Sequence, residues 1–323
     1  MSSIIAEATA DMLTTYHELN GDIDVLYEEP SPLEFMRYVA KNRPLVVRRG
    51  CSKWLAVRTW NAHYLQDIMK DIPVGVAITP HGNADSVLKR PEDGSTYFVK
   101  PFELDEPFST FLSYLQSSNA QTAAELVKYS QAQNDNLRGE YSHLYRDVEP
   151  DIRWASIALQ KEPDAINLWI GNKHSTTALH RDNYENIYCQ IVGSKDFVLL
   201  APVETACINE KFMPSAAYAA DMSLDPDDPP AQVPCAVWDP DKPEENATRF
   251  SSLSKPLRIR LDPGDMLYLP ACWYHKVSQD SSDEGICCSV NYWYDMDFEG
   301  TFFASNSFLR HMAWASTELK KAP

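Results

Sequence analysis

His180 and Asp182, a histidine and an aspartate two positions apart, carry side chains that can bind one metal ion. They lie in residues 176–201, where apolar and polar residues alternate as in β-strands and a Val-Gly-Ser turn at 192–194 interrupts the pattern. On a strand, side chains at positions i and i+2 point to the same face, so the imidazole and the carboxylate project together. The sequence thus predicts part of a metal site that still needs a second imidazole.

His275 can supply that imidazole. An Asp-Pro-Gly-Asp turn at 262–265 separates two strand-like runs, and a third run at 273–277 carries this histidine. An antiparallel barrel can bring the third run beside the strand of His180. Two histidines and one aspartate, with no cysteine among them, form the facial triad that binds Fe(II) and leaves coordination positions open for a substrate and O₂. These three residues are therefore the predicted catalytic iron ligands.

Simpler explanations exist for each part of this pattern. His-x-Asp occurs often by chance, and a single histidine on an apolar strand is more often a hydrogen-bonded core residue. His-Arg-Asp at 180–182 also occurs in the catalytic loop of protein kinases, but there four residues separate the aspartate from an asparagine, whereas three separate Asp182 from Asn186. No Gly-rich loop or Asp-Phe-Gly accompanies it, which excludes a kinase. The combination of three ligands favours the metal site.

Lys195 lies fifteen residues after His180, on the next predicted strand. A lysine that points into a barrel is costly unless an anion meets it. The dicarboxylate 2-oxoglutarate would supply that anion, with one end on iron and its far carboxylate on this lysine. The alternative is a surface lysine at the end of a hairpin, which would be preferred if the triad were absent.

His-x-Asp, a lysine fifteen residues later and Trp-Tyr-His after Asp-Pro-Gly-Asp resemble the jumonji-C branch of the 2-oxoglutarate oxygenases. The likeness is densest in three segments, YENIYC (184–189), GDMLYLPACWYHKV (264–277) and VNYWYDM (290–296). They are most similar to the small protein hydroxylases of that family, which act on lysine. The resemblance extends from about residue 30 to 297, and outside 176–201 and 257–297 it is sparse.

The resemblance implies a mainly β fold with flanking helices, a double-stranded β-helix of the cupin or jelly-roll type. The expected organisation has four parts: an N-terminal helical extension at 1–30, a catalytic domain at 31–297 with its core at about 165–297, an irregular, exposed loop insertion at 203–256 and a C-terminal helix at 298–323. The insertion either shapes substrate access or is a solvated surface excursion, and the sequence leaves both open.

By the same resemblance, Tyr129 and Thr177 would join Lys195 at the far carboxylate of 2-oxoglutarate. Two hydroxyl donors added to a lysine in a dry pocket make an anion site specific. By its position alone, Tyr129 is simply a strand tyrosine.

Three further residues are assigned to the cosubstrate pocket through the resemblance. Asn186 and Asn291 would orient the carboxylate at the metal end, and Tyr188 would flank the cosubstrate. All three are also explained as structural residues of the core strands.

The predicted activity is Fe(II)- and 2-oxoglutarate-dependent hydroxylation of a lysine in a protein, with O₂ as the second cosubstrate and succinate and CO₂ as products. The family's substrate class of translation-associated GTPases is carried over with the resemblance. One alternative is an N-methyl-lysine (histone) demethylase, although no chromatin-reading finger or basic tail accompanies the site. A second is a non-enzymatic cupin-like binding module, which would not need an intact triad with Lys195.

The composition of the 323 residues, 44% of them hydrophobic, indicates an ordered globular protein. A net charge of −17 disfavours nucleic acid and favours a basic or lysine-bearing protein partner. No apolar run is long enough for a membrane span, and no signal peptide is evident. Seven cysteines without Cys-x-x-Cys spacing indicate a reducing compartment, so the cytoplasm is expected, with the nucleus open. The apolar C-terminal helix makes a homodimer a further expectation.

Overall fold

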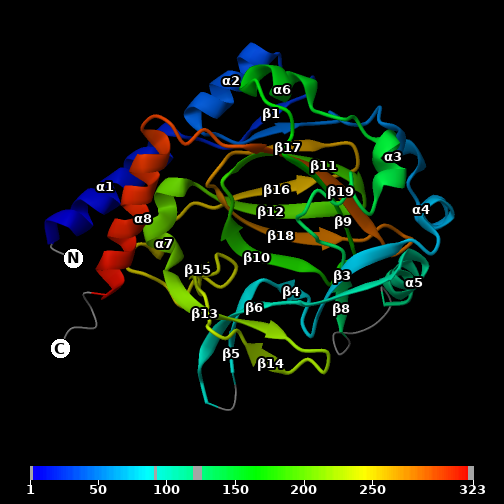
Figure 1. The fold of residues 1–323 in the computed structure, drawn as a ribbon. Coiled ribbons are helices and arrows are strands. Elements are labelled where there is room, and N and C mark those ends of the chain that lie inside the picture. The colour runs from blue at the N-terminus through cyan, green and yellow to red at the C-terminus, as the bar shows by residue number, and fades with distance from the viewer. Residues whose placement is uncertain (1–2, 91–92, 119–125, 319–323) are drawn as a thin grey trace.

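The computed structural model describes residues 3–90, 93–118 and 126–318, and two facing β-sheets form its centre (Figure 1). The larger sheet contains, in spatial order, β1 (Asp24–Leu26), β2 (Leu45–Val47), β17 (Met266–Leu269), β11 (Tyr184–Val192), β19 (Cys287–Asp295) and β9 (Ala165–Gly171). The smaller contains β16 (Leu257–Leu261), β12 (Ser194–Leu200), β18 (Tyr274–Asp280), β10 (Thr176–Arg181) and β4 (Asn83–Ala84). From β9 to β12 and from β16 to β19 successive strands alternate between the sheets, which confirms the predicted jelly roll.

The interior between the two sheets is apolar and aromatic. One cluster of buried residues draws Trp169 and Tyr188 from the larger sheet and Phe197 and Val277 from the smaller. Because side chains alternate along a strand, each strand sends every second residue into this space. The turn between β11 and β12 is tight, with Gly193 at φ 67° and an added Cβ 2.5 Å from the carbonyl oxygen of Asp280. A side chain does not fit there.

Helices cover the outer face of the larger sheet. Phe35, Phe111 and Trp154 pack there against Ile187 and other residues that point outward from the sheet. The helices of the chain are α1 (Ser3–Leu19), α2 (Pro32–Lys41), α3 (Leu55–Thr59), α4 (Ala62–Met69), α5 (Phe108–Ser118), α6 (Arg153–Leu159), α7 (Thr205–Ile208) and α8 (Phe302–Glu318), with short 3₁₀ turns at Ser142–Asp147, Pro202–Glu204 and Ser251–Leu253.

The start of α2 is fixed by a side-chain cap. Ser31 caps the helix, with its hydroxyl accepting from the backbone N–H of Glu34 at 3.3 Å and the Glu34 carboxylate accepting from the N–H of Ser31 at 2.8 Å. Such a capping box satisfies two backbone donors at the helix start. None of the described helices is both long and apolar enough to cross a membrane.

The expectation that residues 203–256 are irregular is wrong. Between β12 and β16 the chain forms α7 and three strands, β13 (Glu210–Tyr218), β14 (Leu224–Pro226) and β15 (Gln232–Ala236). β13 pairs with β14, β15 and β6 (Thr96–Lys100), and β6 pairs with β5 (Ser86–Lys89). The prolines and acids of this segment did not prevent strand formation, and β14 itself has the sequence Leu-Asp-Pro. Residues 215–217 of β13 pair with residues 98–100 of β6, more than 110 positions upstream, and the local sequence does not reveal such a distant partner.

A further, three-stranded sheet joins β7 (Phe102–Pro107), β3 (Pro73–Thr79) and β8 (Val127–Tyr129). Ser130, directly after β8, forms an isolated bridge with Ile170 of β9, so the small sheet is fastened to the barrel. This attachment carries Tyr129 toward the barrel interior.

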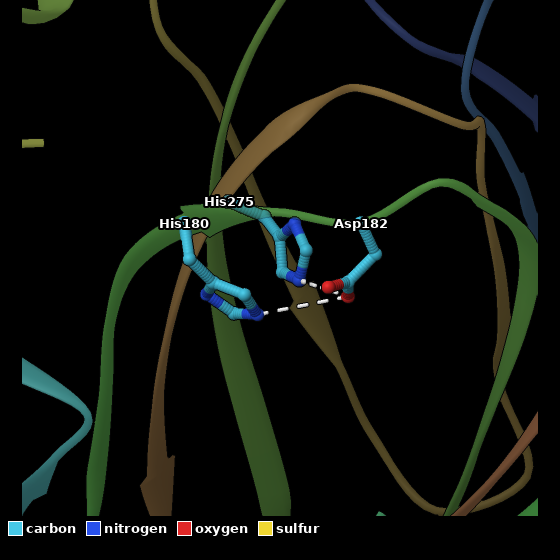
Figure 2. A group of neighbouring side chains, drawn as sticks. All are labelled: His180, Asp182 and His275. Carbon is cyan, nitrogen blue, oxygen red and sulfur yellow. Dashed lines mark ion pairs between the residues drawn. The ribbon is translucent and has the colours of Figure 1, made fainter. Parts of the chain in front are cut away.

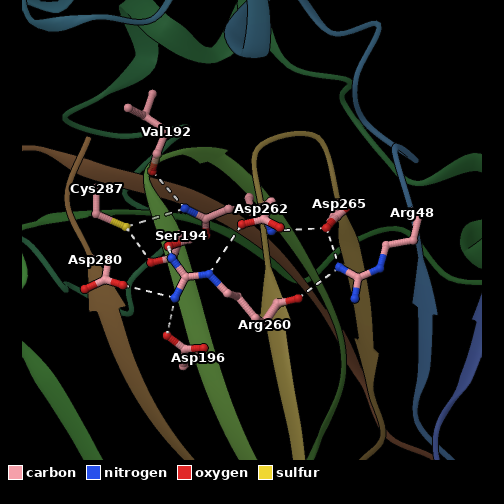
Figure 3. A network of polar contacts seen from close by, with 10 residues as sticks. Arg48, Val192, Ser194, Asp196, Arg260, Asp262, Asp265, Asp280 and Cys287 are labelled. Carbon is pink, nitrogen blue, oxygen red and sulfur yellow. Dashed lines mark hydrogen bonds and ion pairs between the residues drawn. The ribbon is translucent and has the colours of Figure 1, made fainter. Parts of the chain in front are cut away.

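A network of ion pairs ties the strands at the end of β18 that lies away from His275 (Figure 3). Arg260 reaches Asp196 and Asp280, each at 3.0 Å. Arg48 donates to the buried carboxylate of Asp265 at 2.5 Å and to the carbonyl oxygen of Arg260 at 2.9 Å. The network connects β12, β16 and β18 of the smaller sheet with Arg48, directly after β2, and Asp265, directly before β17, and so joins both sheets at this end.

Candidate active site

The paired strands β10 and β18 bring the predicted metal ligands together. His180 and His275 are direct cross-strand partners, with ring centroids 4.1 Å apart. Asp182 stands one residue beyond the end of β10, where its carbonyl oxygen accepts from the N–H of Cys272 at 2.7 Å. Its Oδ2 lies 3.6 Å from Nε2 of His180 and 3.7 Å from Nε2 of His275 (Figure 2). All three ligand atoms lie within 4.8 Å of one another.

The orientation of both imidazoles suits a metal ion. Nδ1 of His180 lies 2.8 Å from the carbonyl oxygen of Ala178, and Nδ1 of His275 lies 3.1 Å from that of Trp273. Each Nδ1 therefore carries the proton, and each Nε2 presents a lone pair toward the carboxylate of Asp182. Two imidazole nitrogens and one carboxylate oxygen on one side of a shared space fit Fe(II) in a facial triad.

The charge states of the ligands also fit a cation. Burial opposes ionisation of Asp182, but the nearby imidazoles, His180 above all, lower its pKa to about 2. Burial and the neighbouring His180 lower the pKa of His275 to about 4. For His180, burial acts to lower the pKa, and the Asp182 carboxylate outweighs it, so the pKa is raised. At neutral pH the site therefore offers an ionised carboxylate and a neutral His275.

Lys195 of β12 lies in an aromatic cage in the barrel interior. Its side chain is 1% exposed, and its Nζ donates to the hydroxyls of Tyr129 at 2.9 Å and Tyr188 at 3.4 Å. The same atom lies 5.6 Å from the ring centroids of Tyr129 and Trp169 and 5.2 Å from that of Tyr188. Burial lowers the pKa of this lysine to about 8. No carboxylate of the described residues pairs with it, so the cage has the chemistry of an anion site.

Strand register sets the separation between this cage and the metal ligands. Lys195 is paired with Gln279, and Leu199 is paired with His275. Four residues along a strand correspond to about 13 Å at the backbone. A short dicarboxylate together with the lysine side chain can bridge that separation, which matches the two ends of 2-oxoglutarate.

The predicted Asn186 and Asn291 lie in a buried hydrogen-bonded chain. The amide of Asn291 donates to Oδ1 of Asn186 at 3.1 Å, and its own Oδ1 accepts from Nε1 of Trp169 at 2.8 Å. Sequence reasoning missed Trp169. The signal was available, because Trp169 and Asn167 stand two positions apart on the apolar strand β9. These hydrogen bonds hold Trp169 in place as one wall of the cage around Lys195.

Gly171 follows Trp169 on the same face of β9 and explains how Tyr129 reaches Lys195. A Cβ at Gly171 would lie 2.6 Å from Cδ2 of Tyr129 and 2.6 Å from Nε2 of Gln279. Only glycine leaves room for the tyrosine ring there.

Thr177 lies on β10 between the metal ligands and β4, and it has no hydrogen bond to Lys195 or Tyr129 within the described part of the chain.

A cleft of about 560 Å³ opens at the metal site. His180 and Thr177 line it, together with Asp85, Gln131 and residues of β13 and β15 in the 203–256 segment. Part of that segment therefore does border the approach to the metal ligands.

Comparison with known proteins agrees with this geometry. The sequence profile of the cupin-like domain matches residues 30–300. The JmjC domain-containing protein E of Dictyostelium discoideum is 32% identical over 317 residues, which cover 91% of this chain and 89% of that protein. The chain belongs to the jumonji-C family of cupin-like proteins.

Two further jumonji-C relatives have names that state activities. The lysine-specific demethylase JMJ32 of Arabidopsis thaliana is 35% identical over 315 residues, 93% of this chain and 89% of that protein. The human bifunctional peptidase and (3S)-lysyl hydroxylase JMJD7 is 34% identical over 282 residues, 86% of this chain and 85% of that protein. Jumonji-C oxygenases typically use Fe(II) and 2-oxoglutarate, and the His180, Asp182 and His275 triad of this member has the ligand set for the metal.

Proposed function

We propose that this jumonji-C oxygenase hydroxylates a lysine side chain of a protein substrate, with translation-associated GTPases as the substrate class. The observation that carries the oxygenase chemistry is the pairing of the His180, Asp182 and His275 triad with the buried, anion-free ammonium of Lys195. The choice of hydroxylation draws on the similarity to the human lysyl hydroxylase. The net charge of −17 supports encounter with a basic protein.

Two groups of residues would bind the two ends of 2-oxoglutarate. His180, Asp182 and His275 would hold Fe(II), which supplies oxidative decarboxylation of 2-oxoglutarate and oxygen insertion into a carbon–hydrogen bond. Lys195 and Tyr129 would hold the far carboxylate by charge-assisted hydrogen bonds. Trp169 and the rest of the buried cage exclude water, which strengthens those bonds.

The test uses the purified protein with Fe(II), 2-oxoglutarate and a lysate of unmodified cellular proteins, followed by mass spectrometry of the proteins. We expect one oxygen to be gained on a lysine, dependent on 2-oxoglutarate and lost in Asp182→Ala. Loss of a methyl group with formaldehyde release would instead establish a demethylase. Peptide cleavage would show in the same spectra, although the sequence contains no His-Glu-x-x-His zinc motif.

A further inference from the structure

Asp85 is held beside the metal-binding strand by backbone pairing. The two-residue strand β4 runs parallel to β10, with Ala84 opposite Thr177, and Asp85 follows directly. The N–H of Thr176 donates to the carbonyl oxygen of Gly82 at 2.7 Å, which fixes the start of this pairing. Asp85 itself has φ 53°, a left-handed conformation that aspartate and asparagine adopt more readily than most residues. Its carboxylate is therefore positioned by the same strand that carries His180.

The carboxylate of Asp85 interacts electrostatically with His180 and Lys100, but among the described residues it forms no ion pair with either. Among the described residues, this carboxylate accepts one hydrogen bond, from Nε2 of Gln131 at 3.4 Å, and forms no ion pair with a lysine or arginine. Burial raises the pKa of the carboxyl group. The other acid deep in the cleft, Glu210, is neutralised by Arg310 at 2.6 and 2.9 Å. A partly buried carboxylate without a directly paired cation favours a cationic ligand.

Gln131 adds a second acceptor at the same place. Its side chain is 8% exposed and lines the cleft, yet its amide oxygen accepts no hydrogen bond from any described residue. Arg181, also in the lining, donates instead to Oδ1 of Asn306 at 2.8 Å. The part of the cleft around Asp85 and Gln131 thus presents oxygen acceptors for which the described chain supplies no matching cationic donor.

We propose that Asp85 and Gln131 bind the ε-ammonium group of the target lysine and hold its side chain against the metal site. The proposal rests on the lysyl hydroxylase function proposed above and specifies its substrate. A primary ammonium has three N–H donors and no acceptor, so a carboxylate oxygen and an amide oxygen are complementary to it. A trimethylated lysine has no N–H to donate, and an acetylated lysine has no charge. The site is therefore expected to select against trimethylated and acetylated lysine.

The test measures binding separately from turnover. Fluorescent peptide libraries with a fixed central lysine, norleucine or N⁶-trimethyl-lysine are titrated by anisotropy into the protein loaded with Fe(II) and 2-oxoglutarate under nitrogen. Air is then admitted, and hydroxylation is measured by mass spectrometry. The wild-type protein is expected to bind the lysine library at least tenfold more tightly than either of the others.

The variants are Asp85→Asn, which tolerates the left-handed backbone, and Gln131→Leu. Because charge-assisted hydrogen bonds are strong, Asp85→Asn is expected to weaken binding of the lysine library by about ten- to hundredfold and to abolish its preference over norleucine. Gln131→Leu is expected to reduce that preference as well. The matched control is Glu103→Gln, which removes an exposed acid of the same cleft and should keep the preference.

Each outcome separates this proposal from the function on which it rests. Equal binding of the lysine and norleucine libraries by the wild-type protein overturns the ammonium site without any variant. An unchanged preference in both Asp85→Asn and Gln131→Leu overturns it even if lysine is hydroxylated. Lysine-selective binding that depends on Asp85, with no oxygen gained and no succinate formed in air, supports the ammonium site and refutes the hydroxylase.

Discussion

Replacing Lys195 by methionine tests the anion site through two opposite effects. The lysine is 1% exposed, and within the described part of the chain its ammonium group donates only to the hydroxyls of Tyr129 and Tyr188. Its pKa of about 8 lies about 2.5 below the ordinary value. That difference corresponds to about 3 kcal/mol of cost for keeping the charged form buried at pH 7. Because the folded-state pKa is the lower one, this cost is present below pH 8 and is relieved as the pH rises toward 10.5.

Lys195→Met should therefore raise the free energy of unfolding of the ligand-free protein at pH 7 by about 1–3 kcal/mol, after the loss of two hydrogen bonds to tyrosine. The same change leaves the far carboxylate of 2-oxoglutarate without a cation in a dry pocket. Losing that partner should cost about 3–5 kcal/mol, or a rise in the Kd for 2-oxoglutarate of more than about a hundredfold. The stability gain and the binding loss come from the same charge.

The measurements are urea denaturation of the ligand-free protein and calorimetric titration with 2-oxoglutarate. Lys276→Met is the matched control, because this lysine of the same sheet is paired with Asp239 and Asp241 at 2.7 Å. It should leave the Kd unchanged and should not stabilise the protein. A Lys195→Met protein that loses stability and keeps its affinity for 2-oxoglutarate would refute the assignment of the cage as the cosubstrate site.

Three further predictions follow from the same contacts. Gly171→Ala forces the Tyr129 ring away and should raise the Kd for 2-oxoglutarate by about tenfold, measured by the same titration, and an unchanged Kd would mean that the tyrosine does not contact the cosubstrate. The affinity for Fe(II) should fall as the pH drops through the raised pKa of His180, because the imidazole must lose its proton before it binds the metal. Equilibrium dialysis measures this affinity, and a Kd for Fe(II) that does not depend on pH would contradict the assignment of His180 as a ligand. Asp265→Ala breaks the ion pair with Arg48 and should lower the free energy of unfolding by about 1–3 kcal/mol in urea, whereas a loss below about 0.5 kcal/mol would make the network in Figure 3 dispensable.

The parts of the site that the sequence predicts are those encoded by local spacing. His180 and Asp182 share a face because one residue separates them, and Lys195 follows across a single turn at Gly193. His275 lies 95 positions from His180, and its place beside that histidine was inferred from the barrel that the strand pattern and the resemblance imply. The structure brings them together as cross-strand partners.

The parts that the sequence does not reveal depend on pairing between distant strands. Trp169 is one of many apolar strand residues until its Nε1 meets Asn291, which lies 122 positions later. Asp85 stands in a short segment without periodicity and becomes part of the cleft only because β4 pairs with β10. Local patterns carry no information about such partners, which is also why 210–218 did not stand out as a strand of a larger sheet.

The most direct test of the account is to supply O₂ enriched in a heavy oxygen isotope to the protein with Fe(II), 2-oxoglutarate and its protein substrate, and to weigh the modified lysine. If the triad catalyses hydroxylation that depends on 2-oxoglutarate, one heavy oxygen atom is expected in the lysine and one in succinate. Neither labelled product is expected with Asp182→Ala. Oxygen in the lysine that comes from water, or lysine modification that persists without 2-oxoglutarate, would contradict it.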